Sequence, residues 1–270
     1  MSRKVSIIII FVLLIGLFGY SGKNIKFNHH VSNGKMDNEY NEKYTLFVSP
    51  DGSDSNIGTE NDPFRSISKA AEVAQVGEHV LIKNGTYVES FYFEKSGTSS
   101  KPIIFSAETG VIVEGLDSIS YLGAIIYIYN SHYVTFSGFH LKNSNWFGIN
   151  IENSSHVTID SCFAENTEAS GIRAYGSNNI IVNNNKIISA RISMASVNTF
   201  QVIHNEVYES SVVGDGINTN GRSSNGIVAY NEVHDNIDIG INVDSWNNLL
   251  TDIQVYGNIL YISSISDPNN

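Results

Sequence analysis

Four oxygen-bearing side chains in the last third of the sequence have the types and spacing of a metal site. Asp215 directly precedes a glycine, and Asp238, Asn242 and Asp244 surround Gly240, further along the chain. Carboxylate and amide oxygens without a thiolate or imidazole suit Ca²⁺ rather than zinc. The alternative is that these residues are ordinary polar turn and surface residues. The choice depends on whether the fold places Asp215 beside the second group.

A second set of residues could contact an acidic ligand. Arg173 is the most natural contact for a carboxylate, because its guanidinium can donate two parallel hydrogen bonds to one. Its alternative role is an ion pair with Glu152. Trp246, Trp146 and Tyr175 could stack on a sugar ring, although exposed aromatic residues also occur on proteins without a sugar ligand. No residue is assigned as a catalytic acid or base.

A recurring phrase predicts how these side chains are positioned. A glycine followed by isoleucine begins the phrase at Gly148, Gly171, Gly216 and Gly240. The first interval is 23 positions and the last is 24. The middle interval of 45 contains two turns, one of which has Ser193-Met194-Ala195 instead of the phrase. A period in the twenties with short strands and polar turns indicates a solenoid. Leucine-rich repeats are the alternative at this length, but their leucine spacing is absent.

Alternation along the strands predicts columns of side chains on the outer wall of the solenoid. The isoleucines point inward, and the residues that follow them face solvent. One column holds Asn150, Arg173, Asn218 and Asn242, and a second holds Glu152, Tyr175, Asn220 and Asp244. Neighbouring turns lie about 4.8 Å apart, so oxygens on two turns can share one calcium ion.

A column of asparagines is predicted at one corner. Asn185, Asn205, Asn231 and Asn258 each follow a short apolar strand. Asparagine tolerates a left-handed backbone at a tight corner, and stacked amides can hydrogen-bond from turn to turn. Cys162, the only cysteine, falls in this column. We expect it to be a small buried residue rather than a nucleophile.

The N-terminal part predicts an exported protein. A basic start and an apolar run from Val5 to Tyr20 have the pattern of a signal peptide, and the run is short for a membrane span. Residues 1–22 are therefore expected to be a signal peptide or an N-terminal anchor, and residues 23–43 a flexible linker. The predicted location is secreted or cell-surface, with membrane contact only through an uncleaved N-terminal segment.

The remaining residues, 44–270, are expected to form one parallel β-helix domain. Ser66 is a candidate N-cap of an amphipathic helix from Ile67 to Val76, which would cover the open apolar end of the coil. No second helix caps the other end, so we expect the last turn to fray or to pair with another molecule, or the domain to be C-terminally incomplete. The oligomeric state is not predicted.

The charge of the chain excludes one class of partner. The net charge is −11, from 16 Lys and Arg against 27 Asp and Glu. Non-specific nucleic-acid binding needs a basic surface, so it is not expected. An acidic protein that binds an acidic polymer needs a cation between the two.

Several phrases early in the domain point to one family. They are residues 47–54, the Asp62-Pro63-Phe64 turn with its helix, residues 83–87, and residues 95–98 with Lys101-Pro102-Ile103. These phrases resemble the opening of secreted right-handed β-helix polysaccharide lyases, and family 9 pectate lyases most closely. The resemblance covers residues 44–263. It implies an all-β, right-handed, single-stranded parallel β-helix with a capping helix, and calcium-assisted β-elimination from an acidic uronate polysaccharide.

The resemblance also implies which residues bind calcium. In the family, one Asp precedes the glycine of one turn, and an Asn-x-Asp-Asp-Gly-x-Asp phrase lies on the next. Asp215 matches the first, and Asn236 begins a partial match to the second. In that match Asp238 is kept, Ile239 replaces an Asp and Asn242 replaces the last Asp. The missing carboxylates predict weak calcium binding, and the family's Gly-Phe-Lys phrase with its catalytic lysine has no match.

Three functions remain open from the sequence. The first is a lyase that acts on an acidic polysaccharide with calcium, or a degenerate or inactive descendant of one. The second is a non-catalytic β-helix surface or glycan-binding protein. The third is a glycoside hydrolase or epimerase, for which Asp215 could pair with Asp238 or Asp244, although no hydrolase motif surrounds them.

Overall fold

A computed structural model describes residues 44–116, 123–210, 214–245 and 250–263 of the 270-residue chain. The predicted signal peptide or anchor and linker lie outside the described residues, as does Trp246. Within the described ranges, no helix has the length and apolar character needed to cross a lipid bilayer.

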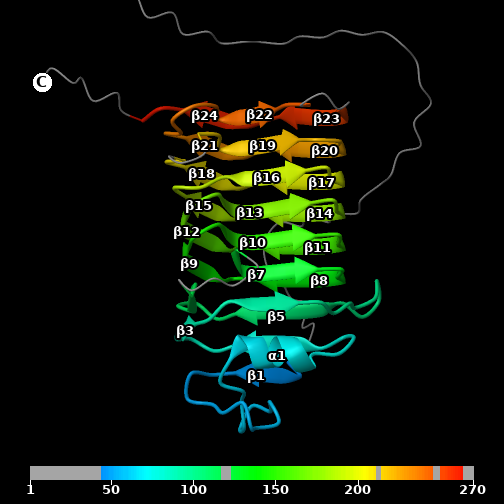
Figure 1. Cartoon of the computed structure of the whole chain (residues 1–270), viewed down its shortest axis with the longest axis vertical. Helices are drawn as coiled ribbons and strands as arrows, with labels where there is room; N and C mark the ends of the chain where they lie inside the picture. Colours follow the sequence, from blue (N-terminus) through cyan, green and yellow to red (C-terminus); the bar gives the residue numbers. More distant parts are fainter. Residues whose placement is uncertain (1–43, 117–122, 211–213, 246–249, 264–270) are drawn as a thin grey trace, which may run out of the picture. The chain divides into compact units, whose positions relative to one another are not determined.

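The described strands form three parallel sheets of nine, eight and seven strands, here called A, B and C (Figure 1). Sheet A contains β1 (Leu46–Val48), β2 (His79–Ile82), β5 (Ile103–Ala107), β8 (His132–Ser137), β11 (Ser155–Asp160), β14 (Asn178–Asn183), β17 (Asn198–Ile203), β20 (Ser224–Ala229) and β23 (Thr251–Tyr256). Sheet B contains β3 (Thr86–Val88), β6 (Ile112–Glu114), β9 (His140–Ser144), β12 (Phe163–Thr167), β15 (Lys186–Ile188), β18 (Glu206–Tyr208), β21 (Glu232–His234) and β24 (Ile259–Tyr261). Sheet C contains β4 (Phe91–Phe93), β7 (Ala124–Tyr129), β10 (Phe147–Glu152), β13 (Ser170–Tyr175), β16 (Ile192–Ala195), β19 (Ile217–Asn220) and β22 (Ile241–Val243).

From β2 onward the chain visits sheets A, B and C in that order on every turn, which confirms the predicted parallel β-helix. The register confirms the repeat: Ile149, Ile172, Ile192 and Ile217 are paired in sequence across sheet C. All four are fully buried. Each contributes about 1.5–3 kcal/mol from burial, so this apolar column holds the outer residues of sheet C in register.

The corner between sheets A and B carries the predicted asparagine ladder. The Oδ1 atom of Asn205 accepts hydrogen bonds from the backbone N–H and the Nδ2 of Asn185, at 2.9 and 3.0 Å. The Nδ2 of Asn205 donates in turn to the Oδ1 of Asn231, at 3.0 Å. The left-handed conformation is found one position earlier than predicted, at Asn184 and His204. The ladder asparagines must point into the stack, so the preceding residue makes the bend.

Cys162 occupies the start of this column, as predicted. Its backbone N–H donates to the Oδ1 of Asn185 at 2.9 Å, and its side chain is buried. Burial raises the pKa of its thiol to about 12. A thiol that stays protonated is a poor nucleophile, which supports the structural role.

A short helix, α1 (Ile67–Val73), packs against β1 and β4 at the first turns (Figure 1). Ser66 is its N-cap, as predicted, and its Oγ accepts a hydrogen bond from the backbone N–H of Lys69 at 3.1 Å. The Glu89 carboxylate accepts two further N–H bonds of the first turn. The helix ends three residues before the predicted Val76, because Ala74 takes an extended ψ of 137° and the chain continues toward β2.

The last turn differs from the ones before it in its burial. Val233 of β21 is 1% exposed, whereas its neighbour in the same inward column, Leu260 of β24, is 52% exposed. No described strand continues sheet B beyond β24. Fraying or association of this turn stays a prediction.

Candidate functional site

The outer side of sheet C carries the residues with the chemistry of a site. Strand register places Asn150, Arg173, Ser193, Asn218 and Asn242 in one column, with Ser193 on the degenerate turn. The predicted column is therefore confirmed. Its asparagines do not face open solvent as expected, because neighbouring side chains cover Asn150 and Asn218 to 3% and 4% exposure. Polar groups so buried need partners within the protein.

Asp215 lies just before β19 and is the centre of the first cluster. It is 7% exposed, and its Oδ2 accepts hydrogen bonds from the Nδ2 atoms of Asn218 and Asn242, at 3.1 and 3.2 Å. Asn242 belongs to β22 on the next turn, so the fold does bring Asp215 beside the second predicted group. The guanidinium of Arg191, on the preceding turn, lies 3.9 Å from the same oxygen.

Arg191 enters this cluster because of the degenerate turn. Register places it opposite Gly171 and Gly216, in the column where the other turns have glycine. Burial lowers the pKa of its guanidinium, while Asp215 acts to raise it. Its Nε donates to the Oγ of Ser170 at 3.4 Å. The one signal for this role in the sequence is an arginine at a position where the neighbouring turns have glycine.

The other two predicted calcium ligands lie on the turn that holds Asn242. Asp238 is exposed and packs against Gly214, where a Cβ on the glycine would meet the Cβ of Asp238 at 2.9 Å. The backbone N–H of Asp244 donates to the carbonyl of Thr219 at 2.9 Å. Both therefore belong to turns that border Asp215.

The donor set fits calcium in its chemistry but is short of carboxylates. Within the described residues, no three His, Cys, Asp or Glu side chains form a group that could hold a metal ion. A site at Asp215 must therefore include amide oxygens. Both neighbouring amides now direct NH₂ to the carboxylate, and each would have to rotate to present its oxygen instead. Arg191 also competes with any cation for Asp215, which makes weak binding the expectation.

Arg173 forms the centre of a second cluster, two turns before Asn218. Its Nη1 donates to the Oε1 of Glu152 at 2.7 Å and to the Oδ1 of Asn150 at 2.9 Å. The guanidinium also lies over the rings of Phe147 and Tyr175, with its Cζ at 5.2 and 4.9 Å from their centroids. The alternative role from the sequence, an ion pair with Glu152, is present. A substrate carboxylate bound by Arg173 would have to share the guanidinium with Glu152.

Glu152 remains a carboxylate under ordinary conditions. Partial burial acts to raise its pKa, but hydrogen bonds from Tyr127, Arg173 and Asn150 outweigh this and lower the pKa overall. The hydroxyl of Tyr127 donates to its Oε2 at 2.7 Å. The cluster around Arg173 is therefore nearly neutral in charge, and hydrogen bonds orient Asn150, Glu152 and Arg173.

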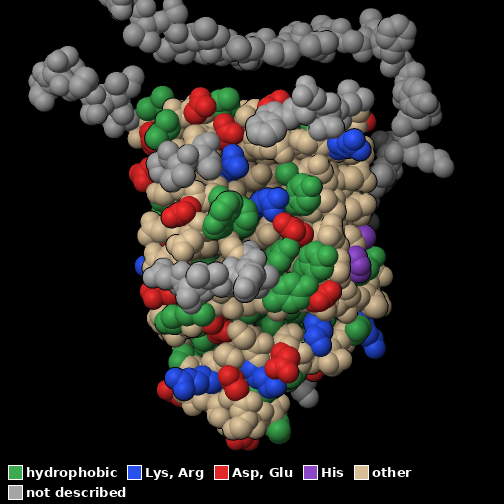
Figure 2. All heavy atoms as spheres, viewed as in Figure 1, with side chains coloured by type: hydrophobic (Ala, Val, Ile, Leu, Met, Phe, Trp, Pro, Cys, Tyr) green, Lys and Arg blue, Asp and Glu red, His purple; other side chains and the backbone are tan. Residues whose placement is uncertain are grey.

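Aromatic side chains extend the same outer face toward the first turns. The rings of Tyr92, Tyr127 and Tyr129 form a cluster with centroids 5.6 to 6.0 Å apart. Trp146 and Tyr175, both named from the sequence, are 58% and 46% exposed. Figure 2 shows hydrophobic side chains gathered over the middle of this side of the molecule, among acidic and basic ones. The tyrosine cluster was missed because its strands lack the Gly-Ile phrase.

Other candidate acid–base groups lie away from this face. Lys186 is the only lysine after residue 142, and it belongs to β15 of sheet B, where its Nζ pairs with Glu206 at 3.0 Å. His234, also on sheet B, stacks between the rings of Tyr208 and Tyr261. Both therefore belong to a different sheet from the strands beside Asp215, and the described strands of sheet C contain arginine but no lysine.

Comparison with known proteins identifies relatives of this chain. Residues 46–198 match the family model described as Pel9A-like, right-handed beta helix region. The uncharacterized protein YwoF of Bacillus subtilis is 35% identical over 126 residues, which are 42% of this chain and 27% of that protein. Pectate lyase PEL9 of Emericella nidulans is 29% identical over 156 residues, 51% of this chain and 37% of that protein.

The solved structure of GH136 lacto-N-biosidase from Eubacterium ramulus is similar in fold. It has a TM-score of 0.57 at 13% identity, over 80% of this chain and 55% of that one. The alignments cover 27% of YwoF and 37% of PEL9. Their shared part is the coil and not the whole of either relative.

Proposed function

The chain belongs to the Pel9A-like right-handed β-helix family, and we propose that it acts on an acidic, uronate-containing polysaccharide outside the cell by calcium-assisted β-elimination. The observation that carries the proposal is the convergence of Asp215, Asn242 and Arg191 from three successive turns on the outer side of sheet C. The likeness to a pectate lyase supports the choice of polymer and reaction.

The chemistry of elimination explains why such a cluster is useful. In this reaction a base takes the proton beside the uronate carboxylate, and the electrons of that bond form a carbon–carbon double bond. The neighbouring bond to the glycosidic oxygen breaks, and this oxygen takes up a proton and leaves as a hydroxyl group. Negative charge develops on the carboxylate, so a preorganised positive group beside it stabilises the transition state. A calcium ion held by Asp215, Asp238, Asn242 and Asp244 would supply that charge.

The protein's own cations support binding at the same face. Arg191 lies against Asp215, and Arg173 is two strands away in the column, about 10 Å along the coil at 4.8 Å per strand. A guanidinium binds a carboxylate through two donors, so both residues are suited to the uronates of one chain. The rings of Phe147 and Tyr175 fix the orientation of Arg173.

The test is formation of the unsaturated product. Polygalacturonate is incubated with the protein and calcium, and the ultraviolet absorbance of the unsaturated uronate is followed. We expect slow product formation that a chelator abolishes and that Asp215→Asn reduces strongly. A flat trace both with calcium and with chelator would refute the lyase. Export is tested separately by locating the protein in the medium or at the cell surface.

A non-catalytic glycan-binding protein is the second candidate. Three observations favour it: Arg173 is already paired with Glu152, both amides donate to Asp215, and the described strands of sheet C have no lysine. On this alternative the polymer binds to the same face without being cleaved. Binding of polygalacturonate at constant absorbance would support it over the lyase.

A further inference from the structure

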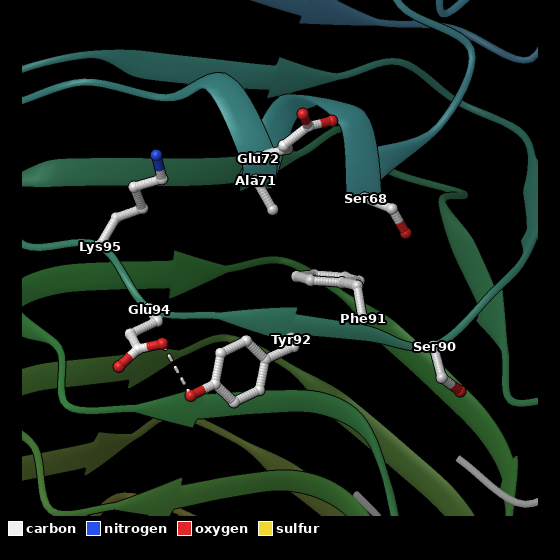
Figure 3. A pocket seen from close by; sticks show the side chains of 8 residues that line it. All are labelled: Ser68, Ala71, Glu72, Ser90, Phe91, Tyr92, Glu94 and Lys95. Carbon is white, nitrogen blue, oxygen red and sulfur yellow. Dashed lines mark hydrogen bonds between the residues drawn. The ribbon is translucent and has the colours of Figure 1, made fainter. Parts of the chain in front are cut away.

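A cavity of about 520 Å³ lies at the opposite end of sheet C from Asp215, between α1 and β4 (Figure 3). Ser68, Ala71 and Glu72 of α1 form one wall. The other wall lies around β4 and consists of Ser90, Phe91, Tyr92, Glu94 and Lys95. Five strand-to-strand steps of about 4.8 Å separate β4 from β19, which is roughly 24 Å. The cavity is therefore separate from the Asp215 cluster, but both lie along the outer side of one sheet.

The aromatic wall of the cavity is held in place. Tyr92 is 40% exposed, and its hydroxyl donates to the Oε2 of Glu94 at 3.0 Å (Figure 3). The rings of Tyr127 and Tyr129 pack against it at centroid distances of 5.6 and 6.0 Å. Because both the hydroxyl and the ring have partners, Tyr92 offers a fixed aromatic surface. Such a surface packs against the C–H groups of a sugar ring at little entropic cost.

One charged side chain at the cavity, Lys95, is open to an acidic ligand. Glu94 accepts hydrogen bonds from Tyr92 and from the Nδ2 of Asn130, and Glu72 pairs with Lys69 at 3.0 Å. Both carboxylates of the wall are thus engaged. The side chain of Lys95 has no ion-pair partner among the described residues. Its three N–H donors remain available for a ligand carboxylate.

We propose that this cavity is a distal binding site for one uronate of the same polysaccharide, with the sugar ring on Tyr92 and its carboxylate on Lys95. The identity of the polymer rests on the proposed function, but the site does not require that the polymer be cleaved. A chain held at both ends of sheet C must span roughly 24 Å. The protein should therefore prefer long oligomers to short ones.

The test is the dependence of affinity on oligomer length. Binding of oligogalacturonates to the full chain is measured by surface plasmon resonance in the presence of calcium. Each oligomer is injected for a few seconds at low temperature, so that cleavage during the measurement is limited. Affinity should rise by about thirtyfold or more once oligomers reach both sites, which is the smallest combined contribution expected of one stacked ring and one charge-assisted hydrogen bond. Lys95→Gln and Tyr92→Ala should each remove most of this rise. Tyr92→Phe, which keeps the ring, and Lys101→Gln, which makes the same charge change elsewhere, should retain it.

The outcomes separate this site from the proposed reaction. If Lys95→Gln and Tyr92→Ala behave like Lys101→Gln, or if no oligomer binds, the distal site is wrong. An equal loss by Lys95→Gln on fully methyl-esterified oligomers also overturns the carboxylate contact. A length-dependent rise without product formation would refute the lyase and leave the distal site. Product formation without a rise of affinity with oligomer length would support the lyase and refute the distal site. The unfolding temperature of each variant shows whether it is folded. If Tyr92→Ala is misfolded, Tyr92→Phe and Lys95→Gln still test the site: loss of the rise in Tyr92→Phe would contradict a contact made by the ring alone.

Discussion

The proposed binding of calcium at Asp215 leads to a quantitative prediction about thermal stability. Asp215 is the one buried carboxylate of the cluster, and the remaining close donors are amides that must rotate to ligate. Few carboxylates place a calcium site at the weak end of the range, with a Kd of about 1 mM. At 10 mM calcium, binding to the folded state alone then stabilises it by about 1.4 kcal/mol. For a domain of this size the unfolding temperature should rise by roughly 3–6 °C.

Removing the carboxylate should abolish that rise. Asp215→Asn keeps the shape and removes the charge, and Asp215→Ala also removes the acceptor of two buried amides. Both variants should start from a lower unfolding temperature, since Arg191 loses its counter-ion. The quantity to compare is therefore the calcium-induced change in each variant, measured by differential scanning fluorimetry with and without chelator.

Asp160 provides a matched control. It lies on β11 of sheet A, and its Oδ1 accepts the Nδ2 of Asn183 from the next turn at 2.7 Å. The local chemistry resembles that of Asp215, but the face is different. Asp160→Asn should retain the full calcium effect. An equal effect in Asp215→Asn and the wild type, or none in the wild type at 10 mM, would refute the metal site.

Three further predictions concern Arg173, the asparagine ladder and the last turn of the coil. Glu152→Gln should raise the affinity for polygalacturonate severalfold, because Arg173 loses its ion pair, and its stability should change by only about 1 kcal/mol; unchanged binding would remove Arg173 from the substrate site. Asn205→Ala should destabilise by about 3–5 kcal/mol in denaturant titration, because it leaves buried partners unpaired, whereas Asn258→Ala at the end of the ladder should cost less. Equal losses would argue against an end effect. A hydrogen bond from His234, together with two from Ser263, lowers the pKa of Asp235 to about 2. The pKa of Asp235 in the unfolded chain is near 3.9. The ionised Asp235 therefore stabilises the folded state above pH 4, and this stabilisation is lost as the pH falls toward 2. Protection of the β24 amides, taken relative to their intrinsic exchange rate at each pH, should fall over that window in the wild type but not in Asp235→Asn.

The repeat positions were predictable because a parallel coil has local rules. Each turn must place small and apolar residues at the same inward points, so Gly148 and Gly171 mark the register without knowledge of the rest of the fold. The asparagine ladder follows from the same periodicity. The bend residue was misplaced by one position, since residues as different as Asn184 and His204 take the left-handed conformation there.

The partners of the site residues were less predictable. The column with Arg173 and Asn242 could be aligned by counting, but the hydrogen-bond donors around Asp215 could not. Turns here vary in length, and the short turn before β16 brings Arg191 into a position that its neighbours fill with glycine. A side chain's partner depends on the paths of two turns at once, which no single turn encodes.

The coil, its register and the outer columns could be predicted from the amino-acid sequence, because each depends on the spacing of residues within one turn. The three-dimensional structure was needed to choose between the two roles of Arg173, to find the amide donors around Asp215, and to find the cavity between α1 and β4. These contacts join residues that are 3 to 27 positions apart or that belong to different kinds of element. Their geometry arises from packing between turns, where side-chain size and loop length act together.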